Sequence, residues 1–231
     1  MTWLDELVDA AHLGLDDRCR EELLGRGVSD EQIRLFRLGY LNGEPSVGDG
    51  RFRAWCRENP RRVQDVFVFP LTNTLGEVRG IQIRAVDRAR KGYQKYVVRT
   101  GEPVLFGLGQ AAEAMFRLGE VLVVEGTFDL FPLQRFVPHV VATLTARVPD
   151  NFVPTLRRVV NRVWLGYDMD EAGSYGARRF EIQHGSEFEL RRLSFPSVHM
   201  PDGKLAKDPG DVWEAWGDDR LGQYLKEQME V

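Results

Sequence analysis

The sequence predicts an α/β protein with a Rossmann-like parallel sheet flanked by helices, preceded by a smaller, basic, mixed α+β subdomain. From about residue 110 onward, short apolar strands alternate with helical segments, which is typical of parallel sheets. The charge is also uneven. Residues 51–104 carry twelve Lys and Arg against five Asp and Glu, although the 231-residue chain has a net charge of -4. We therefore predict two domains, residues 1–108 and residues 109–231.

The N-terminal part combines predicted helices with an antiparallel hairpin. Residues 3–11 form an amphipathic pattern, and Ser29 with Gln32 three positions later has the form of a helix capping box. Gly27 is expected to end the preceding helix. Residues 42–50 are rich in Gly, Pro and Ser and are expected to form a loop. The expected strands are 66–71 and 78–85, joined by a turn at 72–77, with a third at 95–98.

The C-terminal part has a strict alternation of helices and strands. Its expected strands are 121–124, 140–143, 162–167 and 188–193, and its expected helices are 110–118, 127–136, 150–160 and 171–184. A further helix is expected after residue 208. In open sheets of this kind, functional residues gather at the carboxyl ends of the strands.

Acidic residues follow two of these strands directly. Glu125 comes after strand 121–124, and Asp168 and Asp170 come after strand 162–167. Asp208 and Asp211 form a third acidic group before the last helix. Magnesium prefers hard oxygen ligands, and paired ions can stabilise the attacking and leaving oxygens of a phosphoryl transfer. We therefore predict a site for divalent cations at this edge.

Simpler explanations exist for the same residues. Acidic residues at strand ends are often helix N-caps, and Asp129 is expected to be a structural acid that holds its helix or a basic neighbour. The basic stretch at 51–104 is either a path for a polyanion or a chance cluster on a solvated face. Trp213 and Trp216, three positions apart, are expected to pack on one helix face.

The bulk properties exclude several classes of protein. No apolar run is long enough to span a bilayer, and no signal peptide is visible, so a cytoplasmic location without membrane association is expected. Cys19 and Cys56 cannot supply a four-ligand zinc site, and both are expected to be packing residues.

At the acidic motifs, the chain resembles the TOPRIM fold, a metal-binding domain of bacterial-type primases, topoisomerases and some nucleases. The pattern is Glu-Gly-x-x-Asp after one strand and Asp-x-Asp after another, here Glu125-Gly126-Thr127-Phe128-Asp129 and Asp168-Met169-Asp170. This resemblance covers about residues 110–215.

Further segments are similar to the catalytic core of DnaG-type bacterial and phage primases. They are LLGRGVSDEQIRLFRLGY (23–40), VFVFPLTNTLGEVRGIQIR (66–84), QKYV (94–97), DMDEAG (168–173) and KDPGD (207–211). The resemblance thus extends over nearly the whole chain. The first three segments are the ones specific to primases.

The resemblance implies a DNA primase, a nucleotidyltransferase that synthesises short RNA primers on single-stranded DNA from ribonucleoside triphosphates during replication. Glu125, Asp168 and Asp170 would be catalytic metal ligands, joined by Asp208 and Asp211, for Mg²⁺ or alternatively Mn²⁺. Arg84, Lys95 and Tyr96 match positions that contact nucleotide or template, and Arg79 and Arg99 could assist through their charge. Expected partners in trans are a replicative helicase or a separate zinc-binding domain.

The match departs from the family at one motif position. In KDPGD the second aspartate position is Gly210, and Asp211 follows one residue later. Two other functions therefore stay open. The first is a TOPRIM nuclease that uses the same ions to activate water, and the second is a non-catalytic nucleic-acid-binding module.

Overall fold

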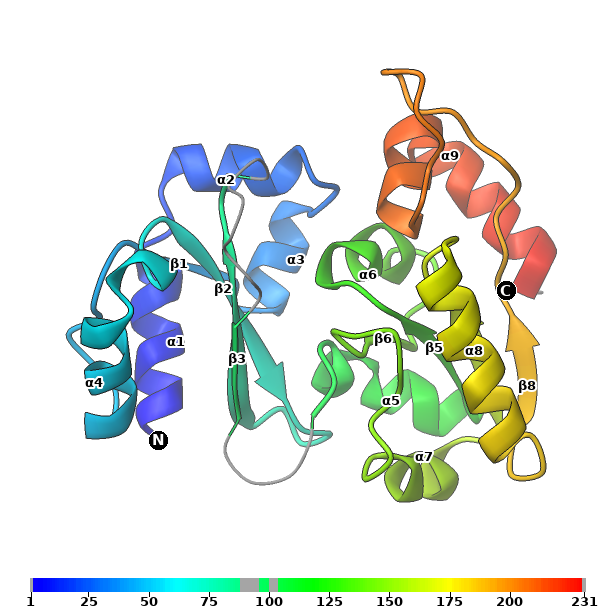
Figure 1. Ribbon diagram of the computed structural model, residues 1–231, viewed down its shortest axis with the longest axis horizontal. Helices are drawn as coiled ribbons and strands as arrows, with labels where there is room; N and C mark the ends of the chain where they lie inside the picture. The colour runs from blue at the N-terminus through cyan, green and yellow to red at the C-terminus, as the bar shows by residue number, and fades with distance from the viewer. Residues whose placement is uncertain (1, 88–95, 100–103, 230–231) are drawn as a thin grey trace. The chain divides into compact units, whose positions relative to one another are not determined.

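The computed structural model describes residues 2–87, 96–99 and 104–229, and it divides into two compact units (Figure 1). The first unit is Met1–Gly25 with Ser29–Val104, and the second is Arg26–Val28 with Leu105–Val231. Residues 105–108, which the predicted boundary assigns to the first domain, therefore group with the second unit. Independent folding of 1–108 and 109–231 stays a prediction.

The first unit is built on an antiparallel sheet in the order β1-β2-β3-β4. Its strands are β1 (Gly39–Leu41), β2 (Val66–Thr72), β3 (Val78–Ala85) and β4 (Tyr96–Arg99). The predicted hairpin 66–71 and 78–85 is confirmed, with Val66 opposite Ala85. In the turn, the Asn73 side chain accepts hydrogen bonds from the backbone N–H groups of Leu75 and Glu77.

Helices pack around this sheet. They are α1 (Trp3–Leu13), α2 (Asp17–Leu24), α3 (Asp30–Leu35) and α4 (Gly50–Glu58), with a 3₁₀ turn at Pro60–Arg62. Leu4, Leu7 and Val8 of α1 pack in one core with Val66 and Val68 of β2. Alternate residues of β2 thus face α1, although the strand is buried along its whole length.

The predicted capping box of α3 is confirmed, because Ser29 and Gln32 each accept a hydrogen bond from the other's backbone N–H. The prediction that Gly27 ends the preceding helix is wrong. Helix α2 ends at Leu24 with Gly25 as its C-cap, whereas Gly27 lies beyond it with φ of 78°.

The second unit contains a four-stranded parallel sheet in the order β6-β5-β7-β8. The strands are β5 (Glu120–Val124), β6 (Val140–Ala142), β7 (Arg162–Gly166) and β8 (Glu189–Arg192). The predicted parallel sheet is therefore confirmed. The chain passes from β6 across β5 to β7, so β5 and β7 lie side by side at the centre.

Helices cover both faces of the parallel sheet (Figure 1). They are α5 (Leu108–Leu118), α6 (Thr127–Gln134), α7 (Val153–Val159), α8 (Glu171–His184) and α9 (Pro209–Met229). Helices α5, α7 and α8 share a core with Val121, Val123, Val163 and Leu165. The alternate strand residues face the other side of the sheet, where α6 packs against β6 and α9.

None of the helices in the described ranges is long and apolar enough to cross a membrane. Cys19 and Cys56 are both buried and free of disulfides, as expected for packing residues.

Candidate metal centre

The central strands bring Glu125 and the Asp168 loop to one edge of the parallel sheet. Val124 at the end of β5 pairs with Gly166 at the end of β7. Glu125 follows its strand directly, and Tyr167 and Asp168 follow theirs. Burial raises the pKa of the Tyr167 hydroxyl, and the nearby charge of Glu125 adds to the rise. These two strand ends lie side by side because β5 and β7 are paired up to their last residues.

The Asp168–Asp170 loop is fixed by the start of α8. Asp170 is the N-cap of this helix, and its Oδ1 accepts a hydrogen bond of 2.8 Å from the Gly173 N–H. A Cβ atom on Gly173 would lie 2.2 Å from the carbonyl oxygen of Asp168. Glycine at this position therefore allows α8 to begin directly against the loop.

The third acidic group lies against the same loop. The Met169 N–H donates a hydrogen bond of 2.6 Å to the carbonyl oxygen of Lys207, which joins the two segments. Asp208 immediately precedes α9, and its Oδ1 accepts a 2.7 Å bond from the Asp211 N–H. Asp211 in turn accepts from the Lys207 N–H at 2.9 Å. Asp208 therefore caps α9, and Asp211 anchors the segment that precedes the helix.

Asp129 is the most buried of the predicted acidic site residues, with 6% of its surface exposed. Its Oδ2 accepts a 2.6 Å bond from the Gly126 N–H, which fixes the turn after Glu125. A Cβ atom on Gly210 would lie 3.2 Å from Oδ1 of Asp208 and 3.4 Å from Oδ1 of Asp129. Gly210 thus lets the start of α9 approach the start of α6.

Asp129 and Asp208 both lie beside Gly210, at the starts of α6 and α9. Burial raises the pKa of Asp208, and the charge of Asp211 adds to the rise, whereas hydrogen bonds from the backbone of Asp211 and Gly210 oppose it. A divalent cation would offset the cost of burying negative charge here, so these carboxyl groups suit a cation chemically.

The acidic side chains do not by themselves form a complete set of ligands for one ion. Within the described part of the chain, no three His, Cys, Asp or Glu side chains are grouped so as to hold one ion together. Magnesium is commonly held by one or two carboxylates together with water and substrate phosphates. Each carboxylate oxygen has more than one lone pair, so an acid that caps a helix can still be a ligand. The residues therefore fit a cation shared with substrate.

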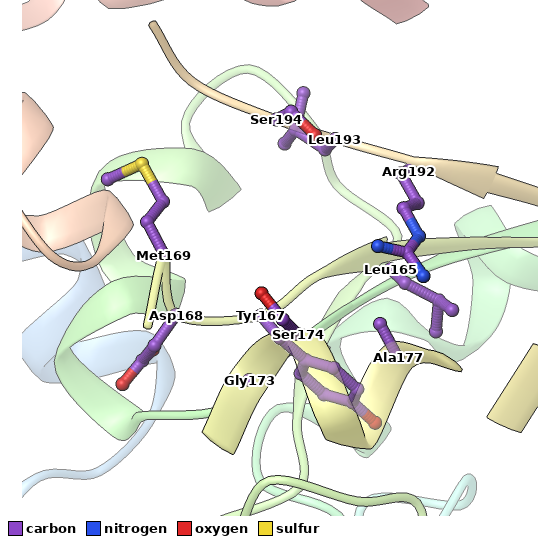
Figure 2. A pocket seen from close by; sticks show the side chains of 10 residues that line it. All are labelled: Leu165, Tyr167, Asp168, Met169, Gly173, Ser174, Ala177, Arg192, Leu193 and Ser194. Atoms are coloured by element: carbon purple, nitrogen blue, oxygen red, sulfur yellow. The ribbon is translucent and has the colours of Figure 1, made fainter. Parts of the chain in front are cut away.

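A pocket of about 240 Å³ borders Asp168 on the β8 side of the loop (Figure 2). Its lining includes Tyr167, Asp168, Ser174 and Arg192. Figure 2 shows Arg192 reaching from β8 toward Ala177 of α8. The Arg192 guanidinium is paired with Glu181, with an Nη2–Oε2 distance of 2.7 Å. The pocket is thus a polar extension of the strand-end site.

The predicted basic residues lie on the antiparallel sheet. Arg84 pairs with Phe67 across β2 and β3, and Arg79 forms an ion pair with Glu77. Tyr96 and Arg99 lie in β4, where their backbones pair with Ile83 and Gly80. Lys95 lies outside the described residues.

Sequence reasoning missed Arg26. It is 9% exposed, and its guanidinium lies 4.8 Å from the ring centre of Phe128, inside the Glu125–Asp129 turn. The sequence contains the pair Arg26-Gly27, but no local pattern links this pair to a turn about one hundred residues further along the chain.

Comparisons with known proteins agree with this architecture. A family model described as Toprim-like matches residues 122–212. A DNA primase from Deinococcus radiodurans is 30% identical over 222 residues, covering 84% of this chain and 38% of the relative. A DNA primase from Neisseria meningitidis is also 30% identical, covering 85% of this chain and 37% of the relative. The chain thus spans less than two fifths of these relatives.

Solved structures give the same result for the fold. A DNA primase domain from Pseudomonas aeruginosa has a TM-score of 0.74 at 21% identity, covering 97% of this chain and 77% of that one. A DnaG primase catalytic domain bound to single-stranded DNA has a TM-score of 0.70 at 21% identity, with the same coverage.

The parallel sheet, with its acidic residues at the ends of β5 and β7, defines a TOPRIM domain. Together with the antiparallel unit and the primase relatives, it identifies the chain as a TOPRIM core of the DnaG primase type.

Proposed function

We propose that this chain is a DNA primase core that synthesises short RNA primers on single-stranded DNA by transferring nucleotidyl groups from ribonucleoside triphosphates. The observation that carries the proposal is the meeting of three acidic segments. Glu125 and Asp168 follow adjacent parallel strands, and the Asp168 loop is hydrogen-bonded to Lys207, next to Asp208. Primase relatives that are 30% identical support the same reaction.

Divalent cations, Mg²⁺ or alternatively Mn²⁺, belong to this proposal. Asp129 and Asp208, which flank Gly210, would hold one, and Glu125, Asp168, Asp170 and Asp211 would supply further oxygen ligands. A bound ion would neutralise the triphosphate and favour loss of the proton from the attacking 3'-hydroxyl. The carboxylates would orient the phosphates relative to that hydroxyl, and no side-chain general base is required.

The template would bind to the antiparallel unit. Its basic stretch, with Arg84 on β3, Tyr96 and Arg99 on β4, and Lys95, would contact phosphates and bases. A DnaG primase catalytic domain of similar fold, solved with single-stranded DNA, supports single-stranded DNA as the ligand. A helicase or a zinc-binding domain would act in trans. A cytoplasmic location is also part of this proposal.

The test is primer synthesis by the purified chain. It would be incubated with single-stranded DNA, four ribonucleotides and either Mg²⁺ or Mn²⁺. We expect short oligoribonucleotides, loss of synthesis with excess EDTA, and a loss of at least about a hundredfold for Asp168→Ala. Arg158→Ala, an exposed change on α7, is the matched control.

Three results would contradict the proposal. Full metal-dependent synthesis by Asp168→Ala would remove the proposed role of the acidic edge. Degradation of the template without any oligoribonucleotide product would instead indicate a nuclease. DNA binding without turnover in any divalent ion would indicate a binding module.

A further inference from the structure

Residues Arg26–Val28 group with the second unit although the chain on both sides of them belongs to the first. Within this unit, Gly27 packs against the indole ring of Trp213. Its φ is 78°, and a Cβ atom on it would lie 2.9 Å from Cε3 of Trp213. A side chain at this position would be both strained and in collision with the indole. Trp213 therefore packs directly on the backbone of Gly27.

Arg135 and Asp218 complete this contact. One Arg135 Nη atom donates a 2.6 Å hydrogen bond to the Gly27 carbonyl, and the other pairs with Asp218. The Arg135 guanidinium lies 5.6 Å from the Trp213 ring centre. Trp213 Nε1 donates to Asp218 Oδ1 at 2.8 Å. We call Gly27, Arg135, Trp213 and Asp218 the tryptophan clamp.

The clamp connects α6 to α9. Arg135 is the C-cap of α6, and Trp213 lies in the first turns of α9. Gly217, with φ of 71° and ψ of 179°, interrupts α9 and brings Asp218 back toward Trp213. The kink is thus part of the clamp, because a straight helix would place residues five apart on different faces.

The same two helices begin at the acidic edge. Asp129 lies in the first turn of α6, and Asp208 immediately precedes α9. Gly210 lies between these two carboxylates, because a Cβ atom on it would lie 3.2 Å from Asp208 Oδ1 and 3.4 Å from Asp129 Oδ1. A small rotation or slide of α9 on α6 would therefore change the separation of Asp129 and Asp208 directly.

We propose that Arg135, Trp213 and Asp218 are positioning residues that fix α9 on α6 and thereby set the spacing of Asp129 and Asp208 for a divalent cation. This inference rests on the proposed function, because it concerns the same carboxylates. Residues that orient metal ligands from outside the coordination sphere typically change metal affinity by 10- to 100-fold when they are removed. The clamp lies outside the motifs that carry the acidic ligands.

The test measures Mn²⁺ binding to the full chain without substrate, by electron paramagnetic resonance of the free ion. Trp213→Ala is expected to weaken binding by about tenfold. Trp213→Phe, which keeps a ring against Gly27, is expected to restore most of the affinity. Trp216→Ala is the matched control. Trp216 is a partly buried tryptophan on the same helix that instead contacts Tyr224 and Arg220.

A second variant covers the case in which Trp213→Ala does not fold. Asp218→Asn keeps an acceptor oxygen for Trp213 but removes the charge that pairs with Arg135, and a smaller loss of Mn²⁺ affinity is expected. If the clamp variants fold and bind Mn²⁺ as tightly as the wild type, or if Trp216→Ala loses as much Mn²⁺ affinity as Trp213→Ala, the inference is overturned. Either result leaves the proposed metal site itself unaffected. No Mn²⁺ binding by the wild-type protein would overturn the proposed metal site together with the inference.

Discussion

At the scale of single residues, glycines decide how closely the acidic segments approach one another. Gly126 would place a Cβ atom 2.2 Å from Oδ2 of Asp129, and Gly173 would place one 2.2 Å from the Asp168 carbonyl oxygen. Neither position requires a positive φ. These glycines are therefore needed for space and not for backbone conformation.

Gly173→Ala tests this packing. Because the contact is with backbone, the Asp168 loop would have to move, and we expect a loss of about 1–3 kcal/mol in the free energy of unfolding. Primer synthesis should fall as well. Gly50→Ala is the control, since nothing lies within 4 Å of its Cβ position, and it should be neutral or slightly stabilising. Urea denaturation of both variants would measure the difference, and equal stabilities would contradict the argument.

The buried imidazole of His139 is expected to make the free energy of unfolding depend on pH. It is fully buried, and burial lowers its pKa, although Glu120, 3.6 Å away, opposes the shift. On acidification, the unfolded chain therefore protonates this imidazole first, at a pKa of about 6.5. The contribution of His139 to the free energy of unfolding is present above that pH and is lost as pH falls below it. For one proton, the free energy of unfolding changes by at most about 1.4 kcal/mol per pH unit.

Unfolding free energies at pH 7.5 and 5.5 would check this sign. His139→Gln should reduce the loss of stability on acidification, whereas His199→Gln, at an exposed position, should not. The same acid sensitivity in His139→Gln as in the wild type would rule out His139 as the cause.

At the scale of elements, the starts of α8 and α9 serve two purposes. Asp170 and Asp208 cap these helices with hydrogen bonds to Gly173 and Asp211, and both are proposed cation ligands. The structure thus confirms the helix-cap explanation for both carboxylates, and the metal-ligand explanation stays a prediction for the same two residues. A capping acid is also fixed in position, which suits a ligand.

Asp170→Ser separates the two roles. Serine caps helices about as well as aspartate, so stability should stay within about 0.5 kcal/mol of the wild type. Asp170→Ala should instead lose about 1 kcal/mol. If the carboxylate binds a cation, primer synthesis should fall in both variants alike. Activity that follows the unfolding free energy, high in Asp170→Ser and low in Asp170→Ala, would indicate a purely structural role.

At the scale of the whole molecule, charge is divided between the two parts of the chain. Residues 51–104 are basic, whereas the acidic edge lies in the second unit. DNA binding and phosphoryl transfer are therefore expected to depend on different residues.

Salt titrations of single-stranded DNA binding would test this separation. The slope of log K against log salt should fall by about 0.7 for Arg84→Ala if one phosphate contact is lost. Asp168→Ala should bind DNA at least as tightly as the wild type, because it removes a negative charge. Weaker DNA binding by Asp168→Ala, with an unchanged slope for Arg84→Ala, would contradict the separation.

The sequence by itself determined the features that depend on neighbouring residues. Short apolar runs located the hairpin 66–85 and the strands β5 and β7, and side-chain chemistry located the cap at Ser29. The order of acidic residues after strands indicated the acidic edge, because the carboxyl ends of parallel strands share one edge of a sheet.

Only the tertiary structure decided which distant residues meet. The strand order β6-β5-β7-β8, the approach of Asp129 to Gly210, and the contact of Gly27 with Trp213 all join segments far apart in the chain. Gly27 was expected to end a helix because the local signal for a helix end and for a tight packing contact is the same residue. Such contacts depend on packing between elements, which local periodicity does not encode.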